Sequence, residues 1–263
     1  MSSEIQHDAR FARNQLTGGC ETMEHLLKGL LDSKGRVGEE VHAIRKLGKS
    51  LRGGFSLFRL KDAAREIQAI GRLLSGPRDA VSRLKTWQLL AWEGDAKVAA
   101  AIVGLLDQQT HSAARRPPPE TIEWCLERVA VAREALAGVP DENLDDTLAR
   151  GLKKLGKQVR KRCLHLDHRG EEDFHDARKA LKAYLGALGF LPEDTVTPAP
   201  EMVEIAELLG DENDVATLSA WLTEHGFTRK FAPTLWKLLK ETRHKHRKQV
   251  IADAERLFSK DAG

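Results

Sequence analysis

Two short segments of the sequence carry basic residues at the same helical spacing. Each reads apolar-His-x-x-Arg-Lys-x-x-Lys, once over residues 41–49 and again over residues 174–182. Positions i, i+3, i+4 and i+7 fall on one face of an α-helix, so each segment presents a histidine and three cations together. Lysine supplies point charges and arginine supplies planar forks of N–H donors, and both bind phosphate. The eight residues are His42, Arg45, Lys46, Lys49, His175, Arg178, Lys179 and Lys182.

Further basic residues extend this pattern along other predicted helices. Residues 36–61, 150–182 and 237–248 together hold 24 of the 42 Lys and Arg residues but only 8 of the 39 Asp and Glu residues. The chain therefore has a strong local positive field despite a net charge of only +3, which favours a polyanion ligand. The additional candidate binding residues are Arg52, Lys153, Lys157, Arg160, Lys161, Lys237, Lys240, Arg243 and His244.

The elements that position these residues are predicted to be helices. Apolar residues recur at steps of three and four almost everywhere, as in Leu144, Leu148 and Leu152, and we find no convincing alternating strand. The row in residues 42–49 lies one position from the apolar stripe, which places its cations at the border of the core. Asp141 is expected to cap the long helix that follows it. Breakers are expected to separate the helices at residues 34–36, 75–77, 117–119, 139–140, 191–192 and 198–200.

An internal repeat organises the chain. The two basic segments are offset by 133 residues, and residues 73–79 resemble residues 208–214 at an offset of 135. A tryptophan follows each member of the second pair, at Trp87 and Trp221. Two motifs in the same order at nearly the same offset predict a duplicated helical unit. We place the first repeat at about residues 1–138 and the second at about 139–263, within one domain.

The sequence contains no recognisable catalytic or metal-binding arrangement. We find no nucleophile–base pair, no glycine-rich phosphate loop and no paired carboxylates, and Gly53-Gly54 is interpreted as a helix irregularity. His42 and His175 would supply only two metal ligands, surrounded by cations. We therefore predict no enzyme activity, no catalytic residue, no metal and no cofactor.

The compartment is predicted from the cysteines and from hydropathy. Cys20, Cys125 and Cys163 are widely spaced and odd in number, as in a reducing cytoplasm. The first residues lack the apolar stretch of a secretory signal, and the longest apolar segment is far shorter than the ~20 residues of a membrane span. We predict a cytoplasmic protein with no membrane partner.

The paired basic segments, each followed by a Leu-Leu-x-x-x-(Arg/Asn)-Asp motif, resemble the CHAD domain, the conserved histidine α-helical domain. The resemblance covers the chain from about Ala12 to Phe258 and implies an all-α fold of two pseudo-twofold-related four-helix bundles. It also implies that a basic groove between the two repeats binds inorganic polyphosphate. The sequence departs from the family pattern at Asn213-Asp214 and at Leu73-Leu74. It lacks the alternating Glu-x-Glu-x-Lys strand of a CYTH domain, so the chain is interpreted as a stand-alone CHAD domain.

These observations predict a polyphosphate-binding helical module. We expect it to be targeted to polyphosphate or its granules, with granule proteins as further partners. RNA binding by the same surface is less favoured, because single-strand binders interleave aromatic rings with cations and only Tyr184 lies near these rows. The chain could instead act as a metal-dependent phosphohydrolase or as a pure interaction scaffold.

Overall fold

The structure is a computed structural model, and it describes residues 2–32, 37–113, 116–167, 170–193 and 196–259. This part of the chain is mainly helical. No strand occurs within these ranges, so the predicted all-α fold class is confirmed. A 3-10 turn, η1 (Asp141–Asn143), precedes α7. The α-helices are α1 (Ser2–Asp32), α2 (Val37–Leu57), α3 (Lys61–Leu73), α4 (Gly76–Leu90), α5 (Ala96–Ala113), α6 (Pro119–Ala137), α7 (Leu144–Leu164), α8 (Glu171–Leu188), α9 (Pro200–Glu224) and α10 (Pro233–Ser259).

Most of the predicted breakers separate helices as expected. Helix α4 begins at Gly76, and α6 begins at Pro119, where proline is tolerated in the first turn. The breaker at residues 34–36 lies outside the described residues. Asp141 does not cap α7 as predicted. It opens η1 instead, and its carboxylate forms an ion pair with Arg13 Nη1 at 2.7 Å.

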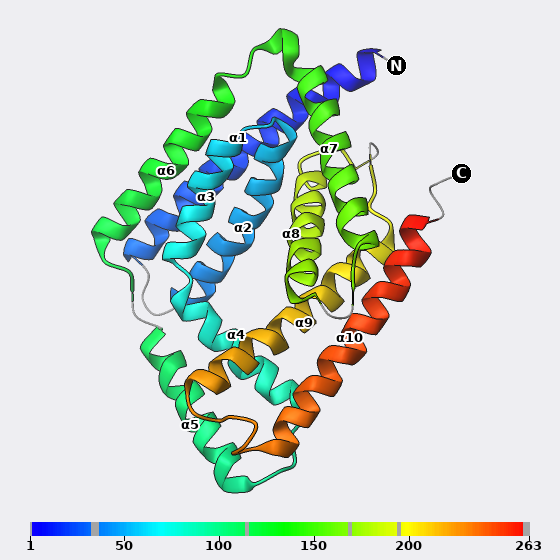
Figure 1. The fold of residues 1–263 in the computed structure, drawn as a ribbon. Coiled ribbons are helices and arrows are strands. Elements are labelled where there is room, and N and C mark those ends of the chain that lie inside the picture. The colour runs from blue at the N-terminus through cyan, green and yellow to red at the C-terminus, as the bar shows by residue number, and fades with distance from the viewer. Residues whose placement is uncertain (1, 33–36, 114–115, 168–169, 194–195, 260–263) are drawn as a thin grey trace. The chain divides into compact units, whose positions relative to one another are not determined.

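The first of two compact units contains residues 1–75, 116–161 and 179–200. Within it α1 packs against α2 and α6, and α3 packs against the same two helices, which closes a four-helix bundle (Figure 1). Leu16, Leu51, Phe55 and Val129 are fully buried between these helices. This bundle fixes the face of α2 that carries the first basic row.

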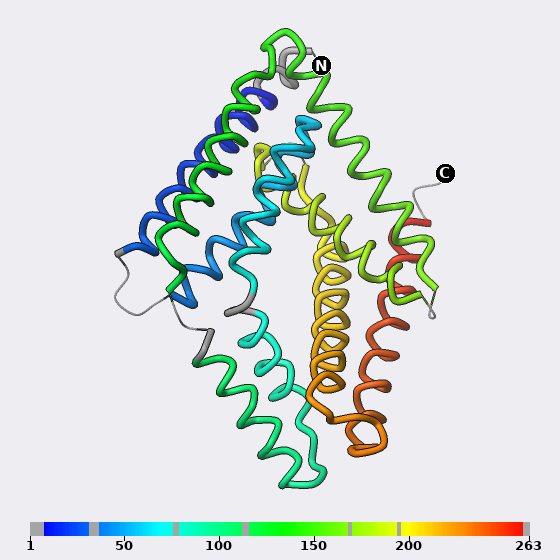
Figure 2. The backbone as a smooth tube through the Cα atoms, turned by 60° about the vertical axis from the view of Figure 1, so that its left-hand side comes forward, coloured from blue at the N-terminus to red at the C-terminus, as the bar shows by residue number. Residues whose placement is uncertain are grey.

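The second compact unit contains residues 76–115, 162–178 and 201–263. Helices α4 and α5 form a hairpin (Figure 2), and their core joins that of α9 and α10 through residues such as Trp87, Ile102, Leu218 and Leu235. Each unit draws residues from both halves of the chain. The repeat boundary near residue 138 therefore concerns sequence similarity and stays a prediction.

Helices α2 and α8 cross closely inside the first unit. A Cβ atom added at Gly53 would meet the backbone of Ala183 and would lie 2.6 Å from the nitrogen of Ala187. Conversely, a Cβ added at Gly186 would lie 3.0 Å from the Cα of Ser50. Helix α2 continues through Gly53, so the predicted irregularity there is wrong. The glycine serves close helix approach, since a side chain would collide with the opposite backbone.

The crossing has a reciprocal form. Gly186 follows Gly53 by 133 residues, and Ala183 follows Ser50 by the same number, which is also the offset of the basic segments. Gly53 of α2 contacts Ala183 of α8, and their equivalents Gly186 of α8 and Ser50 of α2 contact each other. The crossing lies one helical turn after Lys49 in α2 and one turn after Lys182 in α8.

In the described chain no helix is long and apolar enough to span a bilayer.

Candidate anion-binding surfaces

The first basic row lies on α2 at the border of the bundle core. His42 and Lys46 are exposed, whereas Arg45 and Lys49 are half-buried beside the buried Ile44 and Gly48. Arg45 Nη1 donates a hydrogen bond to the carbonyl oxygen of Gly71 in α3, at 2.8 Å. Arg45 is therefore held against α3, and the row lies at the border of the core, as its spacing predicted.

A cavity of about 210 Å³ opens between α2 and α3 beside this row. Among the described residues that line it there is no carboxylate and no aromatic ring. Ile44, Ile67 and Met23 form part of its apolar floor. The cations at the cavity are Arg45, Lys49, Arg52 and Arg72. Four cations around a small space without a lining acid among the described residues make the cavity a candidate site for an anion, because an anion would relieve repulsion between them.

Among these cations, Arg52 has a pKa that burial and Arg72 both lower. Its pKa lies below the ordinary arginine value, first because burial disfavours the charged guanidinium and second because Arg72 repels it. Sequence reasoning named Arg52 but missed Arg72. Arg72 belongs to α3, which carries both acidic and basic residues, among them Asp62, Arg65 and Glu66. The sequence of α3 therefore contains no recognisable basic row. The sequence feature that could have drawn attention to Arg72 is its position directly before the repeated segment 73–79.

The second basic row divides between the two compact units. Lys179 and Lys182 belong to the first unit, and His175 and Arg178 belong to the second. The pattern of exposure is the same as in the first row. His175 and Lys179 are exposed, and Arg178 and Lys182 are half-buried. His175 Nδ1 lies 3.2 Å from Asn213 Oδ1 in α9. The Asn213-Asp214 motif thus supports a histidine of the row.

The predicted row on α7 lies on the outer side of that helix. Lys153, Lys157 and Lys161 are exposed and Arg160 is half-buried, while the leucine stripe on the opposite side of α7 is mostly buried. These lysines are accessible to a ligand in solvent. They do not line the cavity between α2 and α3.

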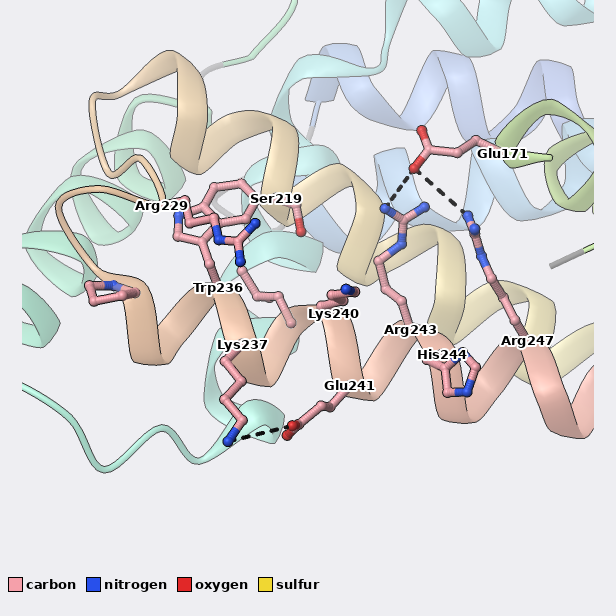
Figure 3. A pocket seen from close by; sticks show the side chains of 12 residues that line it. Glu171, Ser219, Arg229, Trp236, Lys237, Lys240, Glu241, Arg243, His244 and Arg247 are labelled. Carbon is pink, nitrogen blue, oxygen red and sulfur yellow. Dashed lines mark hydrogen bonds and ion pairs between the residues drawn. The ribbon is translucent and has the colours of Figure 1, made fainter. Parts of the chain in front are cut away.

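The predicted row on α10 lines a larger cavity of about 970 Å³ in the second unit (Figure 3). Lys237, Lys240, Arg243 and His244 all contribute to it. Unlike the smaller cavity, this one includes acids. Arg243 is bound to two carboxylates, with Nη2 2.9 Å from Glu212 Oε1 and Nη1 2.9 Å from Glu171 Oε1. Part of the positive charge on α10 is therefore balanced within the protein.

The described residues contain no group of three or more His, Cys, Asp and Glu side chains arranged to hold a metal ion. The three cysteines are buried, and burial raises the pKa of Cys20 and Cys163 to about 12 and that of Cys125 to about 11. Because the thiolate is the reactive form, these thiols are held in an unreactive state.

Comparison with known proteins identifies the fold. The chain resembles a crystal structure of the CHAD domain from the plant Ricinus communis, with 18% identity, a TM-score of 0.62, and coverage of 95% of this chain and 92% of that chain. It also resembles PptA from Streptomyces chartreusis, with 13% identity, a TM-score of 0.56, and coverage of 96% and 98%. A search of curated proteins found no match. The family model of the CHAD domain matches residues 20–223, and no CYTH domain is detected. The chain belongs to the CHAD domain family.

Proposed function

We propose that the protein binds inorganic polyphosphate without turning it over. The observation that carries this proposal is the cavity between α2 and α3, where Arg45, Lys49, Arg52 and Arg72 converge without a lining carboxylate. A chain of phosphates places about one negative charge on each unit, which matches a row of point charges and guanidinium forks. Membership of the CHAD family supports the same ligand class.

The binding surface continues from this cavity along α2 toward the crossing with α8. Lys49 and Lys182 each precede the crossing by one helical turn, so the last lysine of each basic row lies close to it inside the first unit. A linear polyanion that leaves the cavity can then contact Lys182 and Lys179. The exposed lysines of α7 would add weaker contacts, because charge pairs in solvent are screened.

The character of the cavity favours polyphosphate over RNA. A single-strand binder uses aromatic rings as stacking platforms for bases, and none is present among the described lining residues. In a site with only guanidinium and ammonium groups, these groups contact the phosphates, and no ring is present on which a base could stack. RNA would therefore bind only through its backbone, with its bases left unused.

The decisive experiment is a competition titration across salt concentrations. We expect long-chain polyphosphate to displace RNA of equal charge, with an affinity that falls as salt rises because counterions are released on binding. A variant with Arg45, Lys49, Arg52 and Arg72 all replaced by alanine should bind more weakly, and its salt slope should fall by about 0.7 per lost contact. If RNA binds more tightly than polyphosphate, the proposed ligand is wrong.

A matched control uses cations of the first unit outside the rows. Lys28 and Arg65 are exposed, and Arg65 pairs with Asp62 at 2.6 Å. Replacing both with alanine should leave polyphosphate affinity nearly unchanged. If the fourfold variant binds as the native protein does, the site lies elsewhere, and the row Lys153–Lys161 is the next to be tested.

We further propose that binding targets the protein to polyphosphate granules in the cytoplasm. A fluorescent fusion should concentrate on granules, and the fourfold variant should be diffuse. Absence of turnover is tested by incubation of polyphosphate with the protein and Mg²⁺ or Mn²⁺. Release of inorganic phosphate above background would show that the protein is a phosphohydrolase.

A further inference from the structure

The large cavity of the second unit has a different character from the small one. It lies along α9 and α10, and Figure 3 shows its lining side chains. Trp236, Pro233 and Leu239 give it an apolar and aromatic wall. Polyphosphate has no group that would use such a wall. The cavity therefore suits an anion that also carries an apolar ring.

The aromatic ring in this wall is held in place. The indole N–H of Trp236 donates a hydrogen bond to the carbonyl oxygen of Phe227 at 2.7 Å, and Trp236 is only half-buried. A fixed, partly exposed indole offers a flat face on which a planar heterocycle can stack. Arg229 lines the same end of the cavity, beside Trp236 (Figure 3).

The cations follow this ring along one side of α10. Trp236, Lys240, Arg243 and Arg247 occupy positions i, i+4, i+7 and i+11, which share a helix face. At 1.5 Å per residue, Arg243 lies about 10 Å and Arg247 about 16 Å along the axis from Trp236. A ligand lying along α10 would meet a ring platform first and then three successive cations. A nucleoside polyphosphate has its ring and phosphates in that order.

The two arginines are held by an inner carboxylate. Glu212 is almost fully buried, and its Oε1 accepts hydrogen bonds from Arg243 Nη2 at 2.9 Å and from Arg247 Nε at 2.8 Å. Arg247 also lies over the ring of Phe174, with its guanidinium carbon 4.7 Å from the ring centroid. These contacts fix both guanidinium groups. Because the two side chains are already ordered, binding of an anion to them costs little conformational entropy.

A second, outer carboxylate contacts the same two arginines. Glu171 Oε1 lies 2.9 Å from Arg243 Nη1 and 3.8 Å from Arg247 Nη2, and its side chain is 71% exposed. Solvent reaches this carboxylate although both arginines are largely buried, and this screening weakens its ion pairs. A phosphate group carries more charge and can replace this carboxylate, whereas the buried Glu212 stays with its arginines.

We propose that this cavity is a second binding site, for a nucleoside di- or triphosphate. The base stacks on Trp236, the phosphates bind Lys240 and Arg243, and the terminal phosphate displaces Glu171 from the arginine pair. This site goes beyond the proposed polyphosphate function and uses a different compact unit. Each function can therefore fail while the other is retained.

The test is isothermal titration of the full chain with ATP and with tripolyphosphate, which lacks the ring. We expect ATP to bind with one site per chain. Trp236→Leu keeps an apolar side chain and should weaken ATP binding about tenfold, while tripolyphosphate and long-chain polyphosphate bind as before. Lys240→Ala should weaken ATP binding to a similar degree, and Lys245→Ala, an exposed lysine of the same helix off the ring-and-cation face, is its matched control.

Glu171→Gln provides an independent measurement with the opposite sign. It removes the competing charge and should tighten ATP binding about two- to fivefold. Thermal melting of each variant shows that it is folded before titration. The proposal is overturned if ATP does not bind, if Trp236→Leu leaves ATP affinity unchanged, or if it weakens tripolyphosphate equally. Tighter binding of an RNA oligonucleotide than of ATP, lost in Trp236→Leu, would instead make this a nucleic-acid surface.

Discussion

Arg52 offers a perturbation in which stability and binding should change in opposite directions. Its pKa is lowered by burial and by repulsion from Arg72, so in the free protein its charge is held at a cost. Arg52→Met keeps a long apolar stem in the half-buried position and removes the charge. We therefore expect the free protein to be as stable as the native one or more stable.

The expected size of each effect follows from the surroundings of Arg52. Relief of a like-charge contact contributes about 0.2–0.5 kcal/mol, which raises Tm by about 0.4–2 °C in a protein of this size. A charge-assisted contact to phosphate is worth about 1.5–3 kcal/mol, so polyphosphate affinity should fall about 10- to 100-fold. The salt slope should fall by about 0.7.

Two assays read these effects separately, and a matched variant controls for the substitution itself. Calorimetric melting without ligand gives the stability, and polyphosphate titration at several salt concentrations gives the affinity and slope. Arg150→Met is the control, because Arg150 is an exposed residue of the same unit that pairs with Asp146 at 3.2 Å. A marked loss of stability in Arg52→Met with unchanged polyphosphate binding would refute the anion-site reasoning and make Arg52 a structural residue.

Two further predictions concern the scaffold. Gly53→Ala should destabilise the protein by about 1–3 kcal/mol, because its methyl group would meet the α8 backbone. The control is Gly18→Ala, whose methyl group meets nothing within 4 Å and which should be neutral or stabilising by up to about 1 kcal/mol. Equal denaturation midpoints for the two variants would contradict the close crossing. The raised thiol pKa values of Cys20, Cys125 and Cys163 predict very slow reaction with a disulfide reagent at pH 8, and rapid reaction of three thiols in denaturant. A thiol that reacts rapidly in the folded chain would show that its surroundings open readily.

The sequence by itself determined the local order of this protein. Apolar residues at steps of three and four specify helices, because that period places them on one face, and proline and glycine separate the helices at residues 75–77 and 117–119. The same period located the basic row of α2 at the border of the core, where two of its four side chains are half-buried and two are exposed. The repeated motifs also led to the correct family.

Only the tertiary structure decided which charges meet. Arg72 joins Arg45, Lys49 and Arg52 because α3 packs against α2, and spacing within one helix contains no information about that neighbour. For the same reason the sequence did not reveal that Glu212 holds Arg243, a contact across 31 residues. Gly53 was misread because its role depends on a backbone 130 residues away. Periodicity describes a helix and its faces, whereas a binding site is made where faces of different helices meet.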